Sequence, residues 1–405
     1  MTSVSGRCSF SFFQWRQESA AVRHRIDDRC VKRSTRWRVS VAGAAALGVL
    51  ASAACGASGP GESAPGGQAD VAAAKTAIAA YQGHPSAFPV SEPLSKPLPA
   101  GTRFVYLQCS TTACGLIGNL IRPAIAAVGG TLSSVNASST AQASQAAVSS
   151  ALALKPDAVI ITGIDPSLFG DGLKALSAAG IKVVSLSISK DVKPFGITFN
   201  YIGSQLTLQN GKLLADWVIA NKGANADVVF YGVPALDFSG PMQKAFEDEM
   251  KKNCPSCKVR TDPIGLATIG TTSARTVVTD LQAHPSTNVA VFASSEVAAG
   301  LPAAMKAAGL SITTLGYAPT PGNLQDIKDG GLTAGLAIDF PVSVWTGVDA
   351  AARLIEGGQP VPGQQAGQVP TQFLEQKDIT FDPTRGWSGY PDYQQRFTQL
   401  WHPAR

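Results

Sequence analysis

Four cysteines stand in two close pairs, and their spacing limits the chemistry they could do. Cys109 and Cys114 enclose four residues, and Cys254-Pro-Ser-Cys257 has the spacing of a thioredoxin-like redox motif. A redox pair needs the N-terminus of a helix to lower a thiol pKa, whereas Cys254 follows a predicted helix and precedes a predicted strand. We interpret the second pair as a structural clip in a turn. Because four cysteines follow Cys55, an even number, two local disulfides are favoured, Cys109–Cys114 and Cys254–Cys257, with free buried thiols as the alternative for the first.

Other catalytic and metal-binding signatures are weak. His84, His284 and His402 lie beside prolines or near the C-terminus, and Gly211-Lys212 lacks the remaining residues of a phosphate-binding loop. Asp237 and Glu296 could act as an acid and base pair, but so could the acids of most clefts. The sequence therefore predicts a protein that is not an enzyme and that has no metal and no cofactor.

The net charge of +5 is concentrated at the N-terminus. Residues 1–54 contain nine Lys or Arg and three Asp or Glu, which leaves 24 basic and 25 acidic residues in the rest of the chain. A nucleic-acid-binding protein carries a basic patch on its folded part. The sequence therefore predicts no nucleic-acid partner.

The N-terminal 54 residues are typical of an export signal. Basic residues at 32–38 precede a short apolar run at 39–54, and a polar segment follows. Cys55 comes next, in a Ser-Ala-Ala-Cys context that resembles a bacterial lipobox, although Ser52 departs from the preferred Leu. We predict lipidation at Cys55 and anchoring on the extracytoplasmic face of the membrane; cleavage by ordinary signal peptidase, giving a secreted protein, is the alternative. Acidic residues before the basic stretch leave open a translation start near Val31, with residues 1–30 not made.

Regular secondary structure is predicted only after a linker. Residues 55–70 are rich in Gly, Ser and Pro and read as a flexible tether; residues 71–101 read as a short helix and a proline-punctuated strap. Short runs rich in β-branched and apolar residues follow. Their almost continuous hydrophobicity is typical of strands buried on both faces of a parallel sheet. The predicted strands are 103–108, 131–136, 158–162, 182–187, 196–199, 227–232, 258–262, 289–293, 313–316 and 333–338.

Helical segments alternate with these strands. They are predicted at 116–128, 140–153, 168–179, 205–220, 239–252, 272–284, 297–308, 323–328 and 342–356. Several end at a glycine, as helices commonly do. Because so many β-α units exceed one doubly wound sheet, we predict an α/β protein of two lobes, each a doubly wound parallel sheet.

Several segments in this order resemble the type I periplasmic binding protein family, in particular its sugar-binding branch. They are Pro-Asp-Ala-Val-Ile-Ile at 156–161, Ala-Gly-Ile-Lys-Val-Val at 179–184, Val-Phe-Ala-Ser-Ser-Glu at 291–296, Met-Lys-Ala-Ala-Gly at 305–309, Gly-Tyr at 316–317 and Ala-Gly-Leu-Ala at 334–337. The resemblance covers about three quarters of the chain. It implies a substrate-binding protein that captures a small solute, a sugar or something less polar, and delivers it to an ABC transporter permease.

The resemblance also implies the lobes and their boundaries. The chain should cross between the lobes near Gly203, near residues 339–340 and near Thr371, so that residues 102–203 with 341–371 form the N-terminal lobe and residues 204–340 with 372–405 the C-terminal lobe. Ligand would lie between the lobes, at the carboxyl ends of the strands. We expect a monomer that touches the membrane only through its N-terminal lipid.

Transferred onto this chain, the family's ligand-binding positions fall in the loops that follow the strands. They are Ser110, Thr111, Cys114, Ser187, Asn200, Asp237, Phe238, Met242, Ser295, Glu296, Tyr317 and Asp339. At four of the family's binding positions sugar binders have, in chain order, Asp-Arg, Arg, Asn and Asp. This chain has Ser187-Ile188, Met242, Ser295 and Ala318 there instead. Because each unmatched buried polar group costs about 1–3 kcal/mol, this pocket should suit a less hydroxylated ligand.

Two other functions are alternatives to solute transport for a protein of this fold. Transcription repressors carry an N-terminal helix-turn-helix, where this chain has an export signal and a tether. A sensor ectodomain, which reports its ligand state to a membrane signalling partner, is the alternative that the sequence does not separate from transport.

Overall fold

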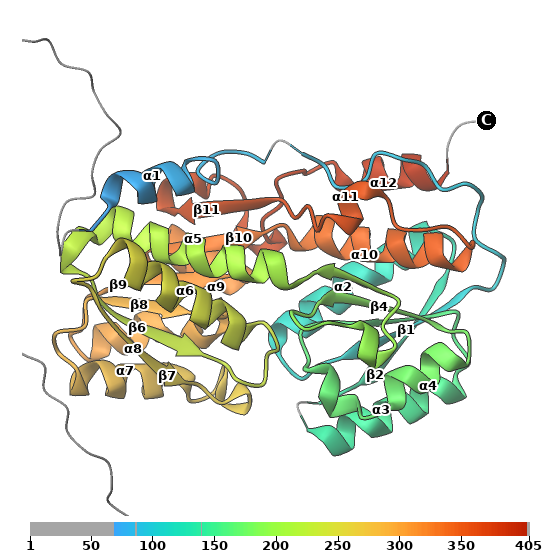
Figure 1. Ribbon diagram of the computed structural model, residues 1–405, viewed down its shortest axis with the longest axis horizontal. Helices are drawn as coiled ribbons and strands as arrows, with labels where there is room; N and C mark the ends of the chain where they lie inside the picture. Colours follow the sequence, from blue (N-terminus) through green and yellow to red (C-terminus); the bar gives the residue numbers. More distant parts are fainter. Residues whose placement is uncertain (1–68, 86, 139, 403–405) are drawn as a thin grey trace, which may run out of the picture. The chain divides into compact units, whose positions relative to one another are not determined.

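The computed structural model describes residues 69–402, except residues 86 and 139 (Figure 1). The predicted signal peptide and Cys55 lie outside these residues. Within them, no helix combines the length and the apolar character needed to cross a bilayer. The chain forms two sheets that share no strand, and the α/β class is confirmed.

The first sheet has the strand order β2-β1-β3-β4-β5, and all its neighbours are parallel. Its strands and helices belong to what we call the first lobe: β1 (Arg103–Gln108), α2 (Thr112–Ala127), β2 (Thr131–Asn136), α3 (Ala141–Ala153), β3 (Ala158–Ile161), α4 (Gly172–Ala178), β4 (Lys182–Ser187), β5 (Phe199–Ile202), α10 (Phe340–Ile355) and α11 (Pro362–Gln365).

The second sheet has the order β11-β10-β9-β8-β6-β7, in which only β11 is antiparallel. The second lobe comprises α5 (Ser204–Lys222), β6 (Asp227–Gly232), α6 (Ser239–Asn253), β7 (Lys258–Pro263), α7 (Ser273–Ala283), β8 (Val289–Phe292), α8 (Leu301–Ala307), β9 (Thr313–Tyr317), α9 (Pro321–Lys328), β10 (Ala334–Ile338) and β11 (Thr371–Glu375). The preceding α1 (Val71–Ala79) packs on α5.

Most predicted strands coincide with observed ones to within a residue at each end. The strand predicted at 196–199 is wrong in position, because Gly196 has φ +76° and ends a short 3₁₀ turn, so β5 begins only at Phe199. The prediction of continuous burial also fails for β2 and β7. These are sheet edges, with alternating half-buried and exposed residues.

The chain changes sheet between β5 and α5, between β10 and α10, and between α11 and β11. It then returns once more, since α12 (Tyr393–Trp401) packs on α10. Assigning residues 372–405 wholly to the C-terminal lobe was therefore wrong. Tyr390, Phe397 and Trp401 lie in the hydrophobic core of the first lobe, where Trp401 stacks on Trp345 with ring centroids 5.2 Å apart.

A proline-punctuated strap links the two lobes at the start of the chain. Tyr81 O accepts a bond from Phe373 N of β11 at 2.7 Å, whereas Leu94 N donates to Leu400 O of α12 at 2.9 Å. Val90 and Leu94 are buried in the core of the first lobe. The strap and α12 thus lie side by side along the first lobe (Figure 1).

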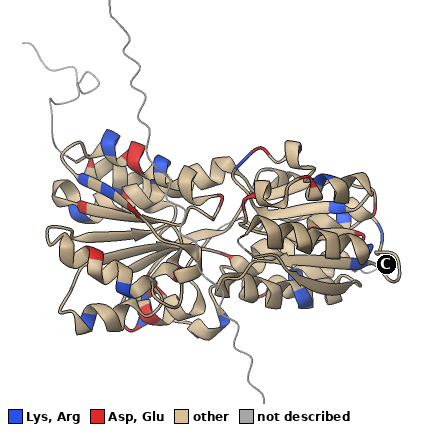
Figure 2. Cartoon of the chain, turned by 90° about the horizontal axis from the view of Figure 1, so that it is seen from below, with Lys and Arg blue, Asp and Glu red and all other residues tan. Residues whose placement is uncertain are grey.

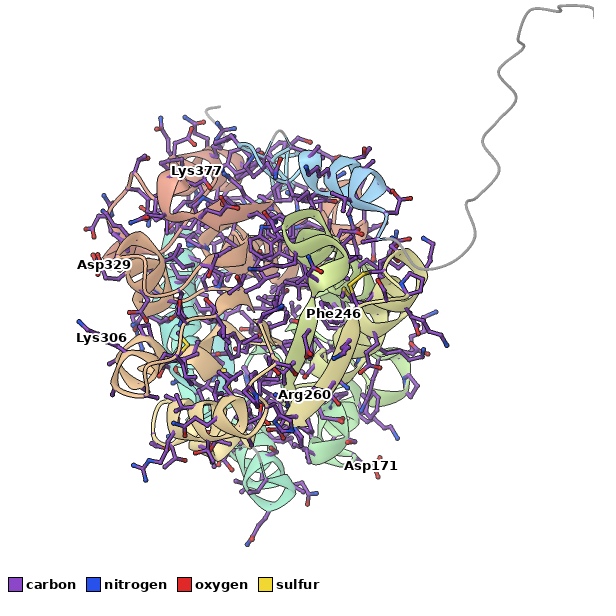
Figure 3. All side chains as sticks on the ribbon, turned by 90° about the vertical axis from the view of Figure 1, so that its left-hand side faces the viewer. Asp171, Phe246, Arg260, Lys306, Asp329 and Lys377 are labelled. Atoms are coloured by element: carbon purple, nitrogen blue, oxygen red, sulfur yellow. A yellow bond between two sulfur atoms is a disulfide. The ribbon has the colours of Figure 1, made fainter. Side chains whose placement is uncertain are left out.

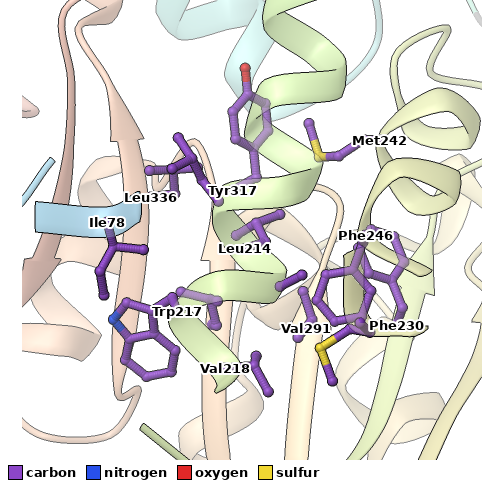
Figure 4. Packing of buried hydrophobic residues seen from close by; sticks show 14 of the residues in the cluster. Ile78, Leu214, Trp217, Val218, Phe230, Met242, Phe246, Val291, Tyr317 and Leu336 are labelled. Carbon is purple, nitrogen blue, oxygen red and sulfur yellow. The ribbon is translucent and has the colours of Figure 1, made fainter. Parts of the chain in front are cut away.

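Each sheet is covered on both faces by helices, which bury its strands. In the second lobe, Phe230 of β6 packs on Phe246 of α6 at 5.1 Å between ring centroids, beside Leu214 of α5 (Figure 4). Gly211 lets α5 and α6 approach closely, because a Cβ there would lie 2.3 Å from Met242 O. Gly211 therefore serves helix packing, and Lys212 is exposed to solvent.

Many charged side chains lie at the periphery. The side chain of Asp171 is 89% exposed and that of Lys377 is 75% exposed (Figure 3). Lys and Arg as well as Asp and Glu are spread over both lobes of the described part of the chain (Figure 2). This distribution agrees with the near-zero net charge of residues 55–405.

Candidate ligand-binding site

The carboxyl ends of strands from both sheets meet around one cavity. The first lobe contributes the N-terminus of α2, the ends of β3 and β4, and the start of α10; the second contributes the loops after β6 and β8 and the ends of β9 and β10. About 80 Å³ of the cavity is open to the centre of a water-sized sphere. Its wall is formed by Cys109, Thr111, Ala113, Cys114, Ile117, Thr162, Gly163, Leu186, Ser187, Ile202, Leu236, Phe238, Ser294, Glu296, Tyr317, Ala318, Ile338, Phe340, Ser343 and Val344.

Half of the predicted ligand-binding residues line this cavity. Thr111, Cys114 and Ser187 come from the first lobe, and Phe238, Glu296 and Tyr317 from the second. The rings of Phe238 and Tyr317 meet edge to face, with centroids 5.8 Å apart. Ser110 is next to the wall in sequence but is exposed to solvent.

The N-terminus of α2 faces the cavity and already has an acceptor from the other lobe. Glu296 Oε1 accepts a hydrogen bond from Ala113 N at 2.6 Å. Burial raises the pKa of the Glu296 carboxyl, while the bonds from Ala113 N and the Thr111 hydroxyl act in the opposite direction. A carboxylate is favoured at this position because the first N–H groups of a helix have no partner within it.

Both predicted disulfides are present. Cys109–Cys114 joins the end of β1 to the first turn of α2, and both residues lie in the cavity wall. Tyr106 Oη donates to Cys114 O at 3.1 Å behind it. Cys254–Cys257 lies at the end of α6, remote from the cavity lining, as expected of a clip.

Two predicted residues lie in the interior of the second lobe instead. Met242 is fully buried in the core between α5 and α6. Ser295 points away from the cavity toward Gly316, where a Cβ would lie 2.2 Å from Ser295 Oγ. Neighbouring Ser295 and Glu296 leave the chain in different directions, so only Glu296 lines the cavity.

Asn200 and Asp339 are also structural rather than part of the cavity wall. Asn200 ties β5 to the end of β4, since its Oδ1 accepts from Ile188 N at 3.1 Å and its Nδ2 donates to Ile188 O at 2.7 Å. Asp339 caps α10: Oδ1 accepts from Val342 N, and Oδ2 accepts from Ser388 Oγ and Gly389 N, at 2.8–2.9 Å. Neither carboxylate oxygen is left for a ligand.

Asp237 belongs to a set of contacts that joins the lobes beside the cavity. Its Oδ2 accepts bonds from Ser189 N and from Ser189 Oγ, the latter at 2.6 Å, and its Oδ1 lies 3.5 Å from Lys190 Nζ. Lys190 also pairs with Asp165. Burial alone would lower the pKa of Lys190, but these two carboxylates raise it. We call Asp165, Ser189, Lys190 and Asp237 the closure latch.

The backbone reinforces the closure latch. Asp237 N donates to Gly163 O at 3.2 Å, and Ile164 forms an isolated antiparallel bridge with Leu236. Gly163 and Leu236 also line the cavity. The two lobes are therefore in direct contact around the cavity, in a closed arrangement.

The wall residues that sequence reasoning missed are mostly apolar. Ile117, Leu186, Ile202, Ile338 and Val344 follow the same hydrophobic patterns as core residues, so nothing in the sequence distinguished them. Ala318, which the resemblance places where sugar binders have Asp, does line the wall. Its φ of +55° is unusual for a residue other than glycine, and such strained backbone is concentrated at functional sites.

Asp339→Asn should remove a pH dependence of stability. Burial raises the pKa of Asp339 to about 7, above its unfolded value near 3.9. The resulting stabilisation is complete below about pH 4, falls as pH rises from about 4 to 7 by at most about 1.4 kcal/mol per unit, and is absent above. Urea unfolding of both proteins from pH 4 to 8 measures the difference in slope. Exposed Asp392→Asn is the control, and superimposable slopes for wild type and Asp339→Asn would contradict the assignment.

Comparison with known proteins agrees with this geometry. A model of the periplasmic binding protein domain matches residues 116–359. No curated protein matches the sequence.

Among the residues that the structure describes, no group of three His, Cys, Asp or Glu side chains is arranged to hold a metal ion.

Solved structures share the fold at low sequence identity. A Caulobacter myo-inositol binding protein is 18% identical, with a TM-score of 0.60 over 71% of this chain and 96% of that one. A 5-methylthioribose transporter solute binding protein from Thermotoga lettingae is 17% identical, with a TM-score of 0.63 over 76% and 99%. A putative LacI transcriptional regulator from Bacteroides fragilis is 15% identical, with a TM-score of 0.57 over 69% and 98%.

The family model covers more than half of the chain, and the two parallel sheets with a cavity between their strand ends are what that family requires. Such a family is one of solute-binding proteins and implies an extracytoplasmic location. The chain belongs to the type I periplasmic binding protein family.

Proposed function

We propose that this protein captures a small solute between its lobes outside the cytoplasmic membrane and delivers it to an ABC transporter permease. The observation that carries the proposal is the cavity itself, whose wall comes from both lobes and which the closure latch and Glu296 hold shut. If the lobes open about the segments that connect the two sheets, a solute can enter the cavity. When the lobes close again, the bound solute is shielded from water.

Three features support binding rather than catalysis. The family is one of solute-binding proteins. The only ionisable carboxyl in the wall, Glu296, is bonded to the N-terminus of α2. The cavity also lies at the carboxyl ends of parallel strands, the usual ligand position in open α/β sheets.

A thermal-shift screen of the purified protein against sugars, polyols, nucleosides and small oxygenated hydrocarbons tests the proposal. A solute that binds the native state stabilises it by about 2.7 kcal/mol at one hundred times its dissociation constant. Ala113→Phe, which fills the cavity wall at α2, should abolish the shift. Ala126→Phe, at an exposed position on the same helix, should preserve it. A hit that survives Ala113→Phe, or a screen without hits, would contradict the proposal.

We further propose that lipidated Cys55 tethers the protein to the membrane. The Ser-Ala-Ala-Cys sequence at the end of the apolar run supports this. In a bacterial host, wild-type protein should fractionate with membranes and Cys55→Ser should be released. Equal membrane association of both forms would favour another attachment, and release of both would favour a secreted protein.

A further inference from the structure

The wall of the cavity offers few hydrogen-bonding groups. Among the described residues that line it, none is Lys, Arg, His, Asn, Gln or Asp. Hydroxyls of Ser and Thr, one tyrosine and Glu296 supply the polar atoms, and the remaining surface is aliphatic, aromatic or disulfide. A polyol would bring five or six hydroxyls into this wall, and each hydroxyl left unmatched weakens binding.

The one charged group in the wall is already paired. Glu296 Oε1 accepts the Ala113 N–H at the start of α2, so the carboxylate compensates the helix N-terminus. An anionic solute would meet this carboxylate without a cation beside it. A cationic solute would have to compete with the helix for the same oxygen atoms. The lining therefore favours a neutral solute.

One fully buried hydroxyl in the wall lacks a partner among the described residues. Ser343, in the first turn of α10, is 3% exposed, lines the cavity, and its Oγ makes no hydrogen bond with any described residue. Buried polar atoms are almost always hydrogen-bonded in native proteins. A hydroxyl or carbonyl oxygen of a bound solute would satisfy Ser343 Oγ.

A second cavity continues the apolar surface. It has about 260 Å³ open to the centre of a water-sized sphere and shares Ala113, Ile117, Ile338 and Phe340 with the first. Leu120 and Trp387 add apolar wall, and Asn119, Thr320, Thr384 and Arg385 are its polar wall residues. The first cavity alone, at about 80 Å³, is smaller than the roughly 150 Å³ that accepts a benzene ring. A larger solute must therefore extend past Phe340.

We propose that the solute is a neutral, mainly hydrocarbon molecule that places an oxygen at Ser343 and extends a hydrocarbon portion past Phe340 toward Trp387. This inference rests on the proposed function and narrows its substrate to oxygenated hydrocarbons such as alicyclic alcohols. It distinguishes this chain from binders of free sugars, which need a ring of polar partners.

Matched probes test the chemistry on the full-length chain by calorimetric titration. Cyclohexanol and myo-inositol share a six-membered ring and differ in five hydroxyls; cyclohexanol should bind at least about 100-fold more tightly. A butyl tail, in 4-butylcyclohexanol, should improve affinity by about 10- to 100-fold. Cyclohexanecarboxylate and cyclohexylammonium should bind more weakly than cyclohexanol.

Two variants locate the solute. Ser343→Ala should weaken cyclohexanol by about 10-fold and leave methylcyclohexane, which replaces the hydroxyl with a methyl group, unchanged. Leu120→Trp, which fills the second cavity, should remove the gain from the butyl tail and weaken cyclohexanol much less, because only part of its ring extends past Phe340. Both variants should unfold at temperatures close to that of the wild type.

Each result separates this inference from the function on which it rests. Tighter binding of myo-inositol or another sugar than of cyclohexanol would overturn the substrate class and leave solute binding intact. Tighter binding of either charged probe than of cyclohexanol would have the same consequence. So would an equal loss of affinity for cyclohexanol and methylcyclohexane in Ser343→Ala. Binding of neither these probes nor any member of the broad screen would overturn both.

Discussion

Asp349→Ala should lower the free energy of unfolding by about 3–5 kcal/mol, as measured by urea denaturation. Asp349 is fully buried on α10 and accepts four hydrogen bonds. Its Oδ2 accepts from Arg353 Nε and Gln364 Nε2, each at 2.6 Å, and its Oδ1 accepts from Trp401 Nε1 at 2.7 Å and Arg353 Nη2 at 3.4 Å. Removing this carboxylate takes the acceptor away from four donor nitrogens on three buried side chains.

The cost comes mainly from the cation that stays behind. Burial raises the pKa of Asp349, whereas Arg353 and the other donors act in the opposite direction. Arg353 is 5% exposed, and its remaining partners are the carbonyl oxygens of Glu92 and Pro93 in the strap. A buried guanidinium without its carboxylate is strongly unfavourable. The variant should therefore loosen both the strap and α12 from the first lobe.

An exposed pair on α12 provides the matched control. Asp392 and Arg396 also stand four residues apart at 2.9 Å, but their side chains are 51% and 44% exposed. Asp392→Ala should lower the free energy of unfolding far less than Asp349→Ala, because solvent screens the pair. Equal losses for Asp349→Ala and Asp392→Ala would show that the buried network does not hold α12.

The sequence predicted the sheets better than the ends of the chain. Strands such as β1 and β4 are short, mostly buried and rich in β-branched, aromatic or other apolar residues, and no other element fits that pattern. By contrast, β11 pairs antiparallel at a sheet edge and α12 is half exposed, so both have mixed polarity. Their places depend on contacts with β10 and α10, which lie far away in sequence and leave no local signal.

The site was predicted at the level of loops but not of side chains. The loops after β1, β6 and β8 do surround the cavity, because parallel strands present their carboxyl ends at one edge. Within a loop, however, the backbone decides which side chain faces inward, as Ser295 and Glu296 show. A polar side chain was also a poor indicator of ligand binding. Asp339 and Asn200 bond instead to backbone groups that only the folded chain brings near.

Asp237→Ala should shift the ligand-free protein from the closed to the open arrangement. In the closure latch this carboxylate accepts bonds from Ser189 N and Ser189 Oγ and faces Lys190. Its loss leaves the buried Ser189 N–H unpaired, whereas Ser189 Oγ keeps the backbone oxygen of residue 237 at 2.9 Å. Hydrogen bonds to a charged group contribute about 1.5–3 kcal/mol each. Losing about 3 kcal/mol from the closed state alone raises the open-to-closed ratio by more than 100-fold.

Small-angle X-ray scattering should then report a larger radius of gyration for Asp237→Ala than for the wild type. Asp171→Ala is the matched control, since its carboxylate pairs only with exposed Lys174 on the first lobe. Identical scattering from wild type and Asp237→Ala would mean that the Glu296 contact and the backbone bridge at Ile164 suffice to hold the lobes together.

The same variant separates closure from recognition. Asp237 does not line the main cavity, so the contacts that a solute makes there stay the same. The apparent affinity of the variant for the solute should nevertheless fall by the factor by which the closed population falls. The reason is that binding must then supply the free energy of closing. A solute that binds Asp237→Ala as tightly as wild type, while scattering shows open lobes, would have to be held by one lobe alone.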